Sequence, residues 1–261
     1  MALFHSCFFS DVLGMQSRAE VILPDRLEEG RPLPTLYLLH GLSDDETIWC
    51  RHTSLELYAR GYYLAIVMPN AHRSFYLDSD DGHTRYFTYI TEELPKLMES
   101  FFPLAKEREH RFVAGLSMGG YGAFKCALAR PDRYAAAASF SGVLDFDYAF
   151  RNWEYLSTVI SEETAATAPA NIIDAANKLA ALSKLTPEIK IPKLYQECGT
   201  EDFLYEGNIK FRDNALSNGL PLEYHERPGT HNWEFWNECI RKTLAWLPLQ
   251  TESNKTTAIG V

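Results

Sequence analysis

The sequence predicts an α/β protein built on a mostly parallel, eight-stranded sheet with helices on both faces. Three observations predict it. Short apolar runs alternate with segments of helical character along most of the 261 residues. Several runs, such as 35–39 and 63–69, are apolar at almost every position, as in strands buried on both faces. Glycine closely follows several of them, and such sheets bind ligands at the carboxyl ends of their strands.

The first half of the chain predicts a hairpin followed by two buried strands. Five residues that begin at Gly14 join two β-rich runs, which predicts an antiparallel pair. A loop and helix over 44–60, with Gly61 as its C-cap, separate the next two strands. The strands expected in this half are 4–13, 19–23, 35–39 and 63–69.

The second half continues the alternation after a helix over 88–101, which tolerates Pro95 near its start. The segment from Gly142 to about Pro187 interrupts the pattern. It holds two helical stretches but too few apolar residues for a core of its own, so we expect a cap over the sheet. The helical stretches are 145–158 and 171–185, the later strands are 135–141, 191–198 and 222–225, and the later helices are 205–217 and 233–246.

One domain is expected to hold most of the chain, because this length suits a single α/β core. The hydrophobic fraction of 46% and the charged fraction of 23% are those of a globular protein. We therefore expect a domain over residues 1–250, with the cap inserted at about 143–187. Residues 251–261 are polar and without periodicity, which predicts a flexible tail.

Charge and cysteine usage exclude several classes of function. A formal net charge of −10 disfavours nucleic acid and anionic membranes as partners and favours a small molecule. The five cysteines are scattered and lack the spacing of zinc ligands, so neither a disulfide framework nor a metal site is expected. No run reaches membrane-spanning length, and the N-terminus lacks a signal-peptide pattern. We expect a cytoplasmic protein with no metal and no organic cofactor.

A nucleophile elbow is the strongest motif. An apolar run from Arg111 passes through Gly115-Leu116-Ser117-Met118-Gly119 into a segment compatible with a helix. Glycine is needed on both sides of the serine, because a side chain there would collide with the neighbouring strand or helix. The turn would expose the Ser117 hydroxyl at the N-terminus of that helix, where developing negative charge is favoured. The motif predicts a catalytic serine; a glycine-rich turn without a catalytic role is the alternative.

A serine nucleophile requires a histidine base and an acid that orients it. After an elbow of this kind, both are expected later in the chain, the acid first. Asp202 lies in the turn after a late strand, and His231 lies in the loop before the last helix. Glu201 and Glu206 compete for the role of the acid, but Asp202 is favoured because it comes late in its turn. We predict a Ser117–His231–Asp202 triad.

The oxyanion of acyl transfer needs two backbone N–H donors. One is expected from the residue after the nucleophile and one from the loop after the third strand, which assigns Met118 and Leu42. In that loop, Gly41 would let the backbone approach the substrate, and His40 would be a buried, hydrogen-bonded support.

Aromatic residues near the predicted strand ends are candidates for the wall of a substrate pocket. Trp49 and Trp233 are assigned to substrate binding together with Gly41. Because most aromatic side chains belong to cores, core packing is the alternative for each. The remaining candidates are Phe75, Tyr76, Trp153 and Trp236.

The chain resembles the bacterial tributyrin esterase family, in the esterase D-like branch of the α/β-hydrolase superfamily. The resemblance covers residues 8–247 and implies the α/β-hydrolase fold. It also implies hydrolysis of short-chain carboxylic esters, including aryl esters, by the residues assigned above, and in some members deacetylation of sugars or release of cinnamoyl groups. Family members are often oligomeric, so a homo-oligomer is a candidate assembly. The matching blocks are 38–43, 67–70, 91–95, 114–122, 139–142, 198–205 and 229–233.

Several alternatives stay open beside a serine carboxylesterase that acts through an acyl-enzyme. S-formylglutathione hydrolases share the blocks around the serine, although residues 73–78 lack the glycine-rich lead-in of that branch. Transfer of the acyl group to another alcohol would depend on details of the pocket. A binding module without catalysis on the same fold is the alternative of a different class.

Overall fold

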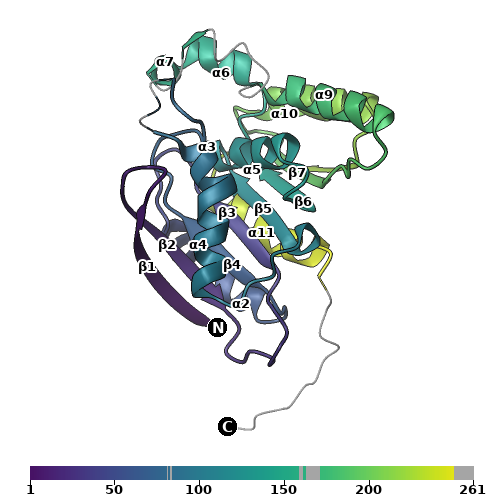
Figure 1. The fold of residues 1–261 in the computed structure, drawn as a ribbon. Coiled ribbons are helices and arrows are strands. Elements are labelled where there is room, and N and C mark those ends of the chain that lie inside the picture. Colours follow the sequence, from purple (N-terminus) through teal and green to yellow (C-terminus); the bar gives the residue numbers. More distant parts are fainter. Residues whose placement is uncertain (81, 83, 159–160, 163–170, 250–261) are drawn as a thin grey trace.

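The computed structural model describes residues 1–80, 82, 84–158, 161–162 and 171–249 (Figure 1). The predicted tail at 251–261 and the centre of the predicted cap, residues 163–170, lie outside this part of the chain.

Eight strands form one mixed sheet, as predicted, and their order in it is β1-β2-β4-β3-β5-β6-β7-β8. The first two strands form an antiparallel hairpin, β2 pairs antiparallel with β4, and every later pairing is parallel. The parallel strands therefore end at one edge of the sheet. The strands are β1 (Ala2–Ser10), β2 (Met15–Leu23), β3 (Thr35–Leu39), β4 (Ala65–Pro69), β5 (Arg111–Leu116), β6 (Ala136–Phe140), β7 (Lys193–Gly199) and β8 (Leu222–Arg227).

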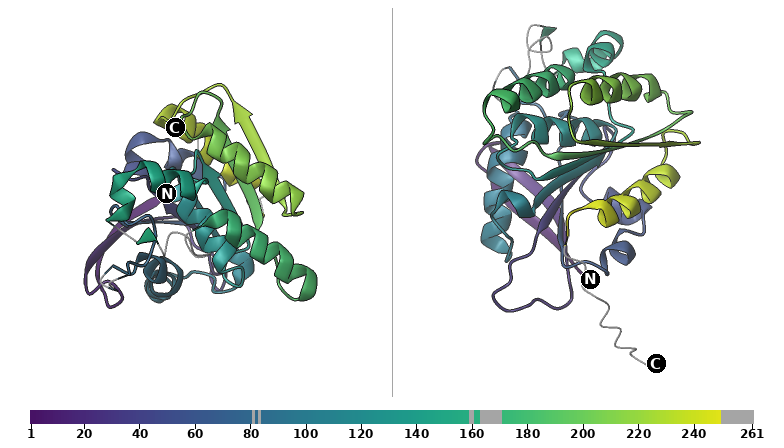
Figure 2. Two further views of the ribbon diagram at one scale, coloured as in Figure 1. Left: turned by 90° about the horizontal axis from the view of Figure 1, so that it is seen from above. Right: turned by 90° about the vertical axis from the view of Figure 1, so that its right-hand side faces the viewer.

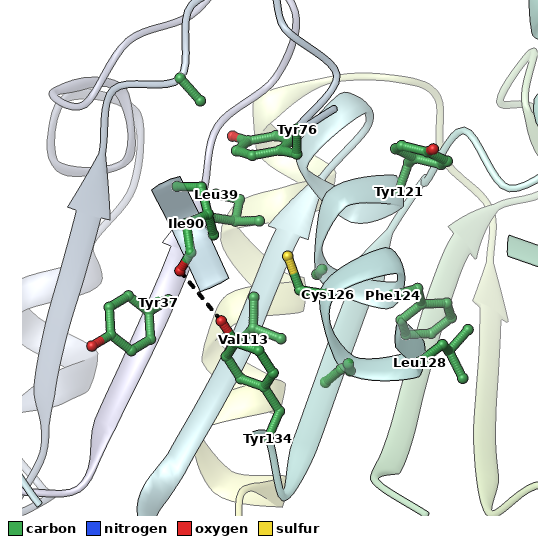
Figure 3. Close-up of a cluster of buried hydrophobic side chains, with 14 of the residues drawn as sticks. Tyr37, Leu39, Tyr76, Ile90, Val113, Tyr121, Phe124, Cys126, Leu128 and Tyr134 are labelled. Carbon is green, nitrogen blue, oxygen red and sulfur yellow. Dashed lines mark hydrogen bonds between the residues drawn. The ribbon is translucent and has the colours of Figure 1, made fainter. Parts of the chain in front are cut away.

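Helices cover the sheet on both faces (Figure 2). Successive residues of β3 alternate between the two cores: Tyr37 and Leu39 pack with α4, α5, α9 and α10, whereas Leu36 and Leu38 pack with α1, α2 and α11. Figure 3 shows part of the first core, in which Tyr134 donates a hydrogen bond to the carbonyl of Ile90. The helices are α1 (Ile48–His52), α2 (Leu55–Ala59), α3 (Tyr86–Thr88), α4 (Leu94–Phe101), α5 (Met118–Ala129), α6 (Phe146–Asn152), α7 (Glu154–Ser157), α9 (Ile172–Leu185), α10 (Tyr205–Ser217) and α11 (Trp233–Trp246).

The helix predicted over 88–101 is not a single α-helix. A π-helical turn, η1 (Tyr89–Glu93), joins α3 to α4, and the Leu94 N–H donates to the carbonyl of Tyr89, five residues earlier. Pro95 lies in the first turn of α4 and has no N–H of its own. Because a proline ring clashes with the carbonyl four residues before it, the wider turn is the local solution.

The helix predicted within 44–60 is two short helices, α1 and α2, separated by extended backbone at Thr53. The second ends at Ala59 with Arg60 as its C-cap, so the prediction of Gly61 as C-cap is wrong. Gly61 also does not adopt the left-handed conformation that a C-terminal glycine usually supplies.

The segment predicted as a cap has two different parts. In its first part the backbone is extended at Trp153, which divides the predicted helix into α6 and α7, at the top of Figure 1. In its second part α9 packs against α5 and α10 and belongs to the helical layer of the sheet. The limits of the cap and the single-domain organisation stay predictions.

Candidate active site

The turn at Ser117 has the strained backbone of a nucleophile elbow. The serine connects β5 to α5 with φ 53° and ψ −116°, a conformation that L-residues rarely adopt. A Cβ at Gly115 would lie 2.4 Å from the carbonyl oxygen of Gly119, and a Cβ at Gly119 would lie 2.5 Å from that of Leu39. The predicted need for both glycines is thus confirmed, because the added carbon would meet the backbone of α5 in the first case and the end of β3 in the second.

The side chains of Ser117, His231 and Asp202 form a continuous hydrogen-bonded path. The serine Oγ lies 3.0 Å from His231 Nε2, and His231 Nδ1 lies 2.8 Å from Asp202 Oδ2. In the neutral imidazole that suits both contacts, the hydroxyl donates to Nε2 and Nδ1–H donates to the carboxylate. The buried carboxylate is held through its other oxygen, which accepts the N–H of Leu204 at 2.9 Å.

The competing candidates lie elsewhere. Glu201 and Glu206 are exposed and make no contact with His231 among the described hydrogen bonds. His225 lies on β8 with its Nε2 2.7 Å from Glu223, away from the serine. The structure therefore brings together the three predicted residues and leaves the alternatives outside.

A tight turn follows β3 and lies beside the serine. The Gly41 N–H donates to Asp44 Oδ2 at 3.2 Å, and the Asp44 N–H donates to the Gly41 carbonyl at 3.3 Å. Leu42 therefore lies in a turn that two hydrogen bonds close. A Cβ at Gly41 would lie 2.7 Å from Leu116 Cδ1, which shows how closely the turn packs against the elbow. Leu42 lines the adjoining cavity, and Met118 begins α5 directly after the serine. These are the two positions predicted to supply oxyanion donors.

The side chain of His40 is hydrogen-bonded to this turn and to the backbone at Ala71. Its Nδ1 lies 2.7 Å from the carbonyl of Gly41, and its Nε2 accepts the N–H of Ala71 at 2.9 Å. The ring is buried, and burial lowers the pKa of His40 to about 4. The imidazole is neutral at physiological pH, which matches its predicted structural role.

A cavity of about 800 Å³ opens over Ser117. One wall is apolar and includes Phe75, Val143 and Trp153. The lining also includes Trp233 and Trp236, whose rings meet edge to face at 5.3 Å. Trp233 and Gly41 thus lie where a substrate would be in contact with them.

Two aromatic candidates lie behind the cavity. Trp49 is fully buried, and its Nε1–H donates to the carbonyl of Leu39 at 3.1 Å. It supports Trp233 edge-on at 5.2 Å but does not line the cavity, which corrects its assignment to substrate binding. Tyr76 is also buried and donates its hydroxyl to the carbonyl of His40. The directions in which the side chains of Trp49, in α1, and Tyr76 point depend on packing that the sequence pattern does not contain.

The cavity also has lining residues that were not predicted, among them Phe203, His52 and Asp44. Phe203 is 67% exposed and lies against the ring of His231 at 4.7 Å between centroids. His52 lies over Trp233 at 5.0 Å. Asp44 is partly buried, and desolvation raises the pKa of its carboxyl. Only Phe203 had a sequence signal, as an aromatic residue directly after the predicted acid.

The described residues include no group of His, Cys, Asp or Glu arranged to hold a metal ion. All five cysteines are free. None of the described helices combines the length and the apolar character needed to cross a membrane.

A protein-family model described as "Putative esterase" matches residues 10–247, which include the elbow, the acid and the histidine. The chain belongs to this esterase family. It is a carboxylic ester hydrolase of the serine hydrolase class, in the esterase D branch of the α/β-hydrolases.

Relatives of the esterase match nearly its whole length. It is 30% identical to an acetyl esterase of Caldicellulosiruptor saccharolyticus, over 95% of this chain and 98% of that protein. Among solved structures, a substrate-bound, fluorophosphonate-binding serine hydrolase of Staphylococcus aureus has a TM-score of 0.85 at 33% identity. An S-formylglutathione hydrolase of the same organism has a TM-score of 0.81 at 31% identity. Each comparison covers 94% of this chain and 98% of the other.

Proposed function

We propose that the esterase hydrolyses short-chain carboxylic esters through a covalent acyl-enzyme, with Ser117 as nucleophile, His231 as base and Asp202 as the orienting acid. The hydrogen-bonded path between these side chains carries the proposal, with separations of 3.0 Å and 2.8 Å. A serine hydroxyl reacts slowly at neutral pH unless a base accepts its proton, and the path supplies that base.

The reaction follows from this path. Ser117 Oγ attacks the ester carbonyl carbon while its proton passes to His231 Nε2. Asp202 holds the imidazole in the required tautomer and stabilises the imidazolium. The imidazolium then gives the proton to the leaving alcohol oxygen, and the acyl group stays on the serine. Water repeats the sequence, with His231 again as base, and releases the carboxylic acid and the free hydroxyl.

Leu42 and Met118 are the proposed backbone donors to the oxyanion. The N-terminus of α5 adds a favourable dipole at the same point, since the helix begins directly after Ser117. The closed turn at 41–44 and the His40 support hold Leu42 in place before substrate arrives. Such preorganisation makes the donors effective, because no energy is needed to orient them during the reaction.

Two observations support a preference for short acyl groups. Phe75, Val143 and Trp153 place bulky side chains along one wall of the cavity. In addition, the 30% identical relative from Caldicellulosiruptor saccharolyticus is named an acetyl esterase.

The test is hydrolysis of p-nitrophenyl acetate, butyrate and octanoate by the wild type and by Ser117→Ala. We expect acetate and butyrate to be preferred, and kcat/KM to fall by at least about a thousandfold in the variant. Ser100→Ala is a matched control, because Ser100 is exposed on α4 and its hydroxyl only donates to the carbonyl of Leu97. Equal rates for wild type and Ser117→Ala would exclude the mechanism.

Thioester hydrolysis is a second candidate, favoured by the 31% identity to an S-formylglutathione hydrolase structure. The same triad could attack either carbonyl. A direct comparison of S-formylglutathione with p-nitrophenyl acetate separates the two functions, and the proposal requires a higher kcat/KM for the oxyester.

A further inference from the structure

Two acidic side chains line the cavity over Ser117. Among its lining residues that the structure describes, none is Lys or Arg, whereas Asp44 and Glu234 carry carboxylates. Glu234 is exposed, so solvent screens its charge. Asp44 is less accessible, and its charge therefore acts more strongly on a bound substrate.

The chemistry of the proposed reaction locates the alcohol part of the substrate. His231 Nε2 must return a proton to the leaving oxygen, so the alcohol lies on the His231 side of the cavity. That wall is formed by residues that follow the histidine, notably Trp233 and Trp236, with His52 over Trp233. Asp44 lines the same cavity as His52, His231 and these two tryptophans.

In the described part of the chain, the Asp44 carboxylate has no Lys or Arg partner. The ion pairs found between described Lys or Arg side chains and carboxylates do not include it, and its hydrogen bond comes from a neutral donor, the Gly41 N–H. Desolvation is the largest influence on this carboxyl and disfavours its charge. A cation bound between Asp44 and the indole faces would offset that cost, because aromatic faces and carboxylates both attract positive charge.

We propose that Asp44 makes the esterase selective by charge. The cavity favours esters whose alcohol part carries a quaternary ammonium or similar onium group, and it disfavours those whose alcohol part carries a carboxylate. This inference rests on the proposed function, since it uses the serine mechanism to locate the alcohol. Asp44 is a specificity-determining residue in addition to closing the turn around Leu42.

The experiment compares acetylcholine with 3,3-dimethylbutyl acetate, which has the same shape with carbon in place of the charged nitrogen. We expect wild-type kcat/KM to be about tenfold higher for acetylcholine, the size of effect that a partly screened charge several ångströms away produces. Asp44→Asn should bring the ratio close to one. Because the asparagine oxygen can still accept the Gly41 N–H, this variant removes the charge and keeps the turn.

Asp45→Asn is the matched control. It changes the net charge by the same amount one residue away, but Asp45 bonds to Thr47 and does not line the cavity. Its ratio should equal that of the wild type. Comparing two substrates within each variant cancels any general effect on the oxyanion turn.

Three outcomes would overturn the inference: a wild-type ratio of one or less, an unchanged ratio in Asp44→Asn, or turnover of p-nitrophenyl acetate without turnover of either choline-shaped ester. Each leaves the proposed function standing. Failure of the proposed function is distinct, since p-nitrophenyl acetate would then not be hydrolysed at all.

Discussion

The two sides of the cavity are built in different ways. On the Ser117 side, strand ends and turns are buried and touch backbone to backbone, and His231 is held by Asp202, Phe203 and Trp236 at once. On the side of α6 and α7, two short helices meet at extended backbone, and Tyr148 is 55% exposed. The reacting groups are thus held by buried backbone contacts, whereas Trp153, which lines the other side of the cavity, lies between two short helices.

The largest expected effect tests the rigidity of the Ser117 side. Gly115→Ala places a Cβ 2.4 Å from a backbone oxygen that cannot move without shifting α5, so we expect loss of folding or destabilisation by about 3 kcal/mol or more. Gly61→Ala is the control, because no atom lies within 4 Å of the added carbon. Urea unfolding of both variants measures the effect. A Gly115→Ala protein as stable as Gly61→Ala would contradict the backbone contact.

The second prediction uses the pH dependence of stability to test how His40 supports the turn at residues 41–44. The folded-state pKa of His40 is about 4, below its ordinary value of 6.5. Because the folded pKa is the lower one, the contribution of the neutral ring to stability is complete above pH 6.5 and is lost as pH falls toward 4. The shift corresponds to about 3 kcal/mol.

The measurement is the free energy of unfolding between pH 7.5 and 4.5 for the wild type and His40→Gln. The variant is expected to lack this part of the pH slope, because glutamine does not titrate. Parallel slopes in the two proteins would show that another group causes the loss.

The smallest effect tests the side of α6 and α7. Trp153→Ala should raise the kcat/KM ratio of p-nitrophenyl octanoate to acetate by about tenfold, because one wall of the cavity recedes. Its effect on stability should stay small, since Trp153 is only half-buried. Trp49→Ala is the matched contrast and should cost about 3–5 kcal/mol of stability, as expected for a fully buried tryptophan. An unchanged ratio in Trp153→Ala would show that this wall does not select substrates by the length of the acyl group.

The sheet, the elbow and the chain order of the proposed triad could be predicted from the sequence. Buried parallel strands are apolar throughout, and a strained serine between glycines has few structural uses, so these features are readable without coordinates. The helices α10 and α11 match their predicted limits of 205–217 and 233–246. Each of these signals is local, within one strand, turn or helix.

Which side chains face the cavity could not be predicted from the sequence. The tertiary structure places Trp49 behind the wall, brings Asp44 and Phe203 into the site, breaks a predicted helix at Trp153, and inserts a π-helical turn before Pro95. The direction of a side chain in a loop or a short helix is set by contacts with residues far away in the chain. Those contacts exist only once both cores have packed.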